Sequence, residues 1–116
     1  MSTDLKQLQT ELRQFAQDRD WDQFHSPKNL ATALSVEAAE LLEHFQWLTD
    51  EQSRTLPQDR LAKVGEEVAD VLLYLLQLTD KLGIDPIEAA KHKLSRNAEK
   101  YPVDRAKGSS KKYTDL

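Results

Sequence analysis

The chain has 116 residues, with 20 acidic and 16 basic side chains and a formal net charge of −4. This length predicts one domain, and the acidic balance is the opposite of that expected for a protein that binds nucleic-acid polymers. The absence of cysteine excludes disulfides and thiolate metal sites, and the polar N-terminus and short apolar runs indicate neither a signal peptide nor a membrane span, so we expect a cytoplasmic protein.

The first two predicted helices are separated by a short polar stretch. The first is amphipathic and ends near residues 18–21; its apolar stripe consists of Leu5, Leu8, Leu12 and Phe15. The second begins at Ser26, a helix-capping residue, which is followed by Pro27 in the first turn. Its apolar side chains continue to about residue 48, where we expect this helix to end.

The third and fourth predicted helices are bounded by glycine and proline. A polar connector, with one helical turn expected after Thr49, leads into a third helix over residues 58–82, which Gly83 ends. The fourth helix begins with Asp85 as its cap and closes at residues 101–102. No strand pattern is present in the sequence, so the predicted fold class is all-α.

The third helix is apolar around most of its circumference, which indicates burial on several sides. Its apolar residues are Val64, Val68, Val71, Leu72, Leu73, Leu75, Leu76 and Leu78. Three companion helices in a chain of 116 residues can hardly cover this surface, so we expect a homo-oligomer.

Two carboxylate pairs interrupt the apolar helices. Glu37 and Glu40 in the second helix, like Glu67 and Asp70 in the third, are spaced i, i+3 and therefore share a face. If the two helices pack antiparallel, four carboxylates converge, and they either become protonated or bind a cation. Oxygen ligands without cysteine favour Mg²⁺, with Mn²⁺ as the alternative. Equally, each pair could face water, or pair with Lys63.

Several segments resemble a known family. "EAAELLEHFQW" and "GEEVADVLLYLL" resemble the MazG-like nucleoside triphosphate pyrophosphohydrolases, and "RDWDQFHSPKNLA", "KLSRNAEKYP" and "KYTDL" are similar to the dCTP pyrophosphatase branch. The resemblance implies an all-α, four-helix bundle over residues 1–102 that assembles into an oligomer, usually a homotetramer. It also implies a basic tail over residues 103–116 that closes over the site.

The resemblance implies an enzyme that uses Mg²⁺ to hydrolyse a deoxynucleoside triphosphate, dCTP or a modified dCTP, to the monophosphate and pyrophosphate, and thereby sanitises the nucleotide pool. The implied metal ligands and catalytic residues are Glu37, Glu40, Glu67 and Asp70. A carboxylate not fully occupied by metal could take the proton from the attacking water. The alternatives are dUTP or another non-standard nucleotide as the substrate, and a non-catalytic helical assembly protein.

The resemblance also implies substrate-binding residues. Trp21, His25, Trp47 and Tyr74 would form the base pocket, and Asn29 would orient the base or sugar, or only stabilise its own turn. Lys93 and Asn97 would contact the triphosphate, with Arg96 as a further candidate, and Lys111, Lys112 and Tyr113 of the tail could fold over it. From the residues alone, tryptophans more often pack in a core, and a lysine such as Lys93 is more often solvated.

Overall fold

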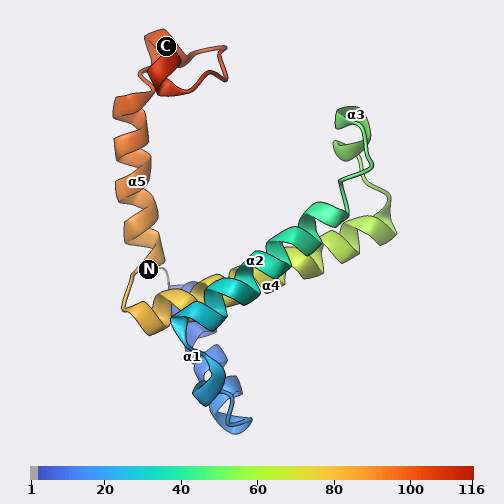
Figure 1. The fold of residues 1–116 in the computed structure, drawn as a ribbon, viewed down its shortest axis with the longest axis vertical. Coiled ribbons are helices and arrows are strands. Elements are labelled where there is room, and N and C mark those ends of the chain that lie inside the picture. Colours follow the sequence, from blue (N-terminus) through green and yellow to red (C-terminus); the bar gives the residue numbers. More distant parts are fainter. Residues whose placement is uncertain (1–2) are drawn as a thin grey trace.

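The computed structural model describes residues 3–116, and within this range every regular element is a helix and no strand is present. Two helices, α2 (Pro27–Glu43) and α4 (Gln58–Leu82), lie antiparallel along each other and make the main contact of the fold (Figure 1). A further helix, α1 (Thr3–Asp18), crosses the C-terminal half of α4. The remaining elements are η1 (Asp22–Phe24), α3 (Asp50–Ser53), α5 (Pro86–Lys100), α6 (Val103–Ala106) and η2 (Tyr113–Asp115).

Local capping sets most of the helix boundaries, as the sequence predicts. The Ser26 hydroxyl accepts a hydrogen bond from the backbone N–H of Asn29 at 3.1 Å, and the Asp85 carboxylate accepts one from the N–H of Ile87 at 3.0 Å. Gly83 ends α4 in the left-handed conformation, with φ 66°, a backbone geometry that L side chains rarely adopt. The single helical turn predicted after Thr49 is α3, which begins with a capping box.

The second helix ends earlier than predicted, at Glu43 rather than near residue 48. Beyond it the backbone switches to tighter i→i−3 bonds, in which Phe45 N donates to Leu42 O at 2.9 Å and Leu48 N to Phe45 O at 2.9 Å. The guanidinium of Arg60 donates to the carbonyl of His44 at 2.7 Å, so a side chain from α4 satisfies a carbonyl at the end of α2.

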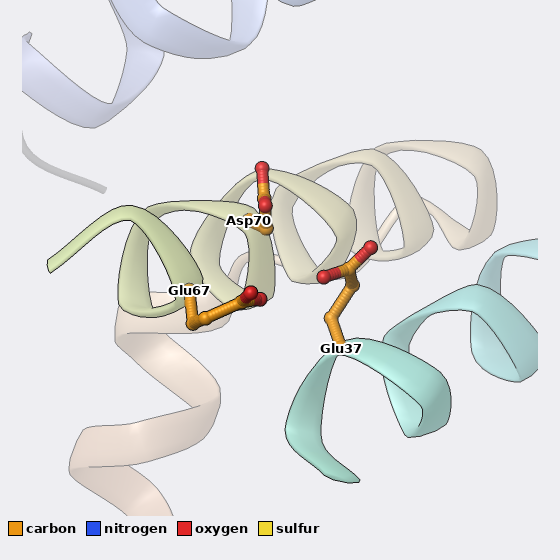
Figure 2. A group of neighbouring side chains, drawn as sticks. All are labelled: Glu37, Glu67 and Asp70. Atoms are coloured by element: carbon orange, nitrogen blue, oxygen red, sulfur yellow. The ribbon is translucent and has the colours of Figure 1, made fainter. Parts of the chain in front are cut away.

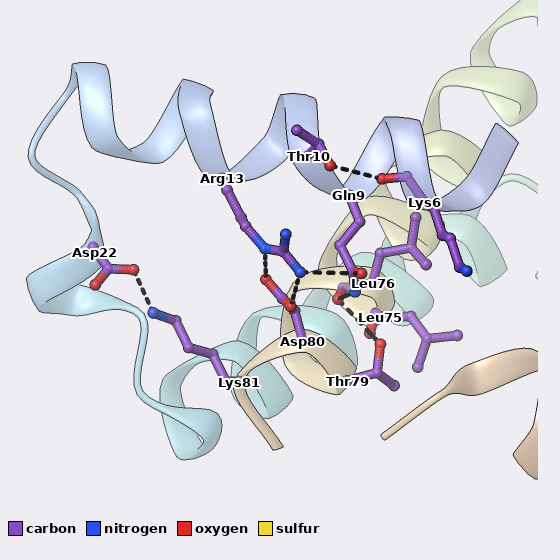
Figure 3. A network of polar contacts seen from close by, with 10 residues as sticks. All are labelled: Lys6, Gln9, Thr10, Arg13, Asp22, Leu75, Leu76, Thr79, Asp80 and Lys81. Atoms are coloured by element: carbon purple, nitrogen blue, oxygen red, sulfur yellow. Dashed lines mark hydrogen bonds and ion pairs between the residues drawn. The ribbon is translucent and has the colours of Figure 1, made fainter. Parts of the chain in front are cut away.

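A polar network holds α1 and η1 against the C-terminal part of α4 (Figure 3). Arg13 donates to both carboxylate oxygens of Asp80, at 2.7 and 2.6 Å, and this pairing raises the pKa of Arg13. The amide of Gln9 donates to the carbonyl of Leu76 at 3.2 Å, and Lys81 pairs with Asp22 of η1. Because exposed ion pairs contribute about 0–1 kcal/mol each, these contacts orient η1 more than they stabilise the fold.

The structure differs from the predicted four-helix bundle in the position of the fourth helix. Helix α5 extends away from α1, α2 and α4 instead of packing beside them (Figure 1). Its residue Leu94 is 70% exposed, and the hydrophobic core of the described residues is small, with Ala16, Leu30 and Leu76 as its buried members. Among the described residues, no helix combines the length and the apolarity needed to cross a bilayer.

Candidate metal centre and nucleotide pocket

Three of the predicted acidic residues meet between α2 and α4. Each of Glu37, Glu67 and Asp70 offers an oxygen, and these oxygens lie within 4.8 Å of one another. In Figure 2 the carboxylate of Glu37 extends from α2 towards α4, which carries the other two. The antiparallel packing of α2 and α4 and the i, i+3 spacing on α4 together produce this group.

The electrostatics of this group favour a positively charged ligand. Burial raises the pKa of Glu37 to about 7, and sharing of its proton with the carboxyls of Glu40 and Glu67, together with the negative charges of Glu40 and Asp70, contributes to the rise. The Oε2 atoms of Glu37 and Glu67 are buried, and no group in the described chain donates a hydrogen bond to either. Buried polar atoms are rarely left unbonded, so a divalent cation fits this set of oxygens.

Glu40 lies beside this group rather than in it. Its oxygens are not among those that lie within 4.8 Å of one another, although its carboxyl is close enough to Glu37 to raise the pKa of that residue. The structure therefore gathers three of the four predicted ligands tightly and places the fourth next to them.

We expect the metal-free protein to lose stability as pH rises from about 4.5 to about 7. In the folded state Glu37 has a pKa of about 7, above its ordinary value of 4.5, so the folded state binds this proton more tightly than the unfolded state does. The stabilisation from this proton is fully present below pH 4.5 and is lost as the pH rises through about 7. Thermal unfolding in a chelator at pH 5 and pH 7.5 measures this loss. Glu37→Gln should flatten the dependence, and an unchanged slope in that variant would contradict the assignment.

A cavity of about 360 Å³ adjoins the carboxylate group between α1, α4 and the segment around η1. It brings together three of the predicted base-pocket residues, Trp21, His25 and Tyr74, and Asp70 also lines it. Six further residues line the cavity and were not predicted as site residues: Leu8, Glu11, Leu12, Phe15, Leu73 and Gln77. Because Leu8, Leu12 and Phe15 form a regular helical stripe, the sequence signal for them was the same as that of a buried core face.

The aromatic side chains of the cavity are packed edge to face. The ring of Trp21 lies 5.7 Å from that of Phe15 at 68° and 6.5 Å from that of His25 at 69°. The backbone N–H of Trp21 donates to Ala16 O at 2.9 Å, which fixes the chain where it leaves α1. The cavity wall is thus apolar and aromatic, as a planar nucleobase requires.

Four predicted substrate-binding residues lie apart from this cavity's lining. The side chain of Asn29 donates to Phe24 O at 2.9 Å and so connects η1 to the start of α2. This contact corresponds to the second role predicted for Asn29, which was to stabilise its own turn. Trp47 follows α2 and is 87% exposed, and Lys93 and Asn97 lie on the outstretched α5. A single chain therefore does not bring Trp47, Lys93 or Asn97 into the cavity.

The segment after α5 folds back on the end of that helix. The ring of Tyr113 lies 5.9 Å from that of Tyr101 at 85°, and the Nζ of Lys100 lies 4.9 Å from the centre of the Tyr113 ring. These contacts hold the predicted tail residue Tyr113 at the C-terminal end of α5. The C-terminal segment as a whole lies away from α2 and α4 (Figure 1).

Comparisons with known proteins identify the family of the chain. The chain is 42% identical to dCTP pyrophosphatase 1 of Mus musculus over 115 residues and to that of Homo sapiens over 116 residues; each match covers 97% of this chain and 66% of the relative, just under two thirds of its length. A crystal structure of a pyrophosphatase from Archaeoglobus fulgidus DSM 4304 superposes with a TM-score of 0.82 at 45% identity, covering 88% of this chain and 95% of that one. The model of the MazG-like family matches residues 32–116, most of the chain, and the chain therefore belongs to the MazG-like family.

Proposed function

We propose that the protein hydrolyses dCTP, or a modified dCTP, to the monophosphate and pyrophosphate with Mg²⁺, and that it removes such nucleotides from the cellular pool. The observation that carries this proposal is the double position of Asp70, which belongs to the carboxylate group and also lines the aromatic cavity. A nucleotide with its base in the cavity would then have its phosphates near the carboxylates. The relatives described above are dCTP pyrophosphatase 1 and a pyrophosphatase, and their names support the same reaction.

In this proposal the carboxylates hold the metal and accept a proton. Glu37, Glu67 and Asp70 would hold Mg²⁺, or Mn²⁺, with Glu40 beside them. When bound, the metal neutralises the charge that accumulates on the phosphate oxygens. Glu40, which lies beside the tight group, is the carboxylate best placed to take the proton from the attacking water.

We propose that the active form is a homo-oligomer, a tetramer. An exposed apolar stripe follows α4, with successive residues seven, four, three and seven positions apart, as in a coiled-coil seam. The stripe, called the α4 seam below, consists of Leu61, Val68, Leu72, Leu75 and Leu82, which are 38–55% exposed. A second copy packed on this seam would bury it, and its outstretched α5 offers Lys93 and Asn97 to the triphosphate of a neighbouring subunit. Trp47 and the tail would join the site in the same way.

Pyrophosphate release from a panel of common and modified nucleoside triphosphates, with and without Mg²⁺, tests the proposal. Metal-dependent release that is fastest with dCTP or a 5-substituted dCTP is the expected result. Faster release from dUTP or another non-standard nucleotide would keep the reaction and change the substrate. A protein without pyrophosphate release from any of these nucleotides would instead fit the non-catalytic assembly protein.

Trp21→Ala should weaken nucleotide binding by about 1–3 kcal/mol, because a base loses its stacking partner. The loss should appear mainly in KM, since stacking is equal in the ground and transition states. Steady-state kinetics with dCTP measure it, and Phe24→Ala, which removes an exposed ring of η1 outside the lining of the cavity, is the matched control. Wild-type KM in a folded Trp21→Ala variant would place the base elsewhere.

A further inference from the structure

Two acceptor side chains of the aromatic cavity lie outside the metal group and receive no hydrogen bond from the described part of the chain. Glu11 lies on α1 and Gln77 on α4, so they line the cavity from two different elements. The other carboxylate of the cavity, Asp70, belongs to the metal group. Glu11 and Gln77 are therefore the acidic and amide groups of the lining that the proposed reaction does not use.

A hydrogen bond fixes the orientation of the Gln77 amide. Its Nε2 donates to the carbonyl of Leu73, four residues earlier on α4, at 3.3 Å. Since a carbonyl oxygen can only accept, the nitrogen must face Leu73 and the Oε1 is left as an acceptor without a donor. This bond uses one of the two N–H bonds of Nε2 and identifies Oε1 as the acceptor end of the Gln77 amide.

Glu11 is exposed and makes no hydrogen bond or ion pair within the described chain. The ion pair of α1 with α4 is made by a different residue, Arg13, which binds Asp80 at the neighbouring cavity. An ionised carboxylate has four lone-pair positions and no proton to donate. A carboxylate without a protein donor is hydrated, and a ligand that displaces its water must supply a donor instead.

Nucleobases differ in what they offer to such acceptors. Cytosine carries an exocyclic amino group that donates, whereas uracil and thymine carry an oxygen at the same position that accepts. A carboxylate and an amide oxygen facing that oxygen would leave three acceptors without a proton between them. Sites built to bind a substrate N–H reject the analogue that lacks it much more strongly than apolar pockets reject a change of size.

We infer that Glu11 and the Oε1 of Gln77 form the acceptor edge of the base pocket and select nucleotides whose base presents an exocyclic amino group. This inference rests on the proposed function, because it assumes that the cavity holds the base. Glu11 and Gln77 are then specificity-determining residues, with Trp21 supplying affinity that does not depend on the identity of the base.

The test compares binding of the non-hydrolysable α,β-imido analogues of dCTP and dUTP by calorimetry in Mg²⁺ at pH 7.5. The wild type should bind the dCTP analogue about tenfold or more tightly than the dUTP analogue. Glu11→Gln keeps the size and adds a donor, so it should narrow this ratio about tenfold, mainly by tightening the dUTP analogue. Glu11→Leu and Gln77→Leu should narrow it by weakening the dCTP analogue. Glu66→Gln and Gln7→Leu, exposed and outside the cavity, are the matched controls and should keep the wild-type ratio.

The outcomes separate this inference from the proposed reaction. Equal binding of the two analogues by the wild type, or a wild-type ratio in both Glu11→Gln and Gln77→Leu, would overturn the inference even if dCTP is hydrolysed. Discrimination that depends on Glu11 and Gln77, in a protein that releases no pyrophosphate, would support the inference and overturn the proposed reaction.

Discussion

Replacement of Glu67 by glutamine is expected to remove most of the pyrophosphate-releasing activity. The variant keeps the size of the side chain and deletes a charged oxygen ligand whose Oε2 is buried without a donor. Loss of a group that merely supports a metal ligand typically costs 10–100-fold, so loss of a ligand itself should reduce turnover by more than about 100-fold. Asp70→Asn should act in the same way. Turnover at saturating dCTP and Mg²⁺ is the measurement.

In the same variants, the stability without metal and the stabilisation that Mg²⁺ adds should change in opposite directions. Without metal, removal of one negative charge relieves repulsion within the group, so the variant should be as stable as the wild type or more stable. Added Mg²⁺ should stabilise the wild type more than the variant, because a ligand that binds only the native state raises its stability. Melting curves with and without Mg²⁺ distinguish these effects.

Two further variants make the test specific. Glu66→Gln alters an exposed carboxylate next to Glu67 that lies about 100° around α4, and it should leave both activity and the metal response unchanged. Glu40→Gln should reduce turnover with a smaller loss of metal stabilisation, since Glu40 lies beside the tight group. Equal metal-induced shifts and undiminished activity in Glu67→Gln and Asp70→Asn would remove both residues from the site.

Sequence reasoning succeeded where a few neighbouring residues determine the structure. The end of α4 and the start of α5 follow from Gly83 and Asp85, whose backbone geometry and capping hydrogen bonds are local. The convergence of Glu37 with the pair on α4 follows from helical spacing and antiparallel packing. The caps and the i, i+3 spacing each lie within one helical turn, so a single sequence shows them, whereas the convergence additionally needed the assumption that the two helices pack antiparallel.

Sequence reasoning failed where the structure depends on a residue far along the chain or on the absence of a packing partner. Helix α2 ends early at a point where Arg60, 16 residues beyond His44, binds the carbonyl of that residue. The pattern of α5 predicts a helix but not the direction in which it leaves Gly83. The stripe that ends at Phe15 has the spacing of a core face, yet Phe15 lines a cavity and is 47% exposed, because none of the helices in residues 3–116 covers it.

The largest effect expected outside the carboxylate group is the loss of assembly when the α4 seam is charged. Leu72→Asp would place a carboxylate in the middle of the seam, between Val68 and Leu75. If a second copy covers the seam, that charge must be buried without a partner, a cost that an interface of ordinary size cannot offset. Sedimentation equilibrium at micromolar concentration should give a homo-oligomer for the wild type and a monomer for the variant.

Activity should be lost together with assembly if neighbouring subunits supply Lys93 and Asn97 to the triphosphate. Ala62→Asp, which introduces the same carboxylate at an exposed position about 100° around α4 from Leu61 of the seam and outside the carboxylate group, is the control that should keep both. Because Leu72 is already 38% exposed in the isolated chain, its replacement should leave the helical content measured by circular dichroism unchanged. A monomeric variant with native helicity would show that the substitution disrupts the interface and not the fold. A wild type that sediments as a monomer, or a Leu72→Asp variant that assembles normally, would show that the seam is not an interface between copies.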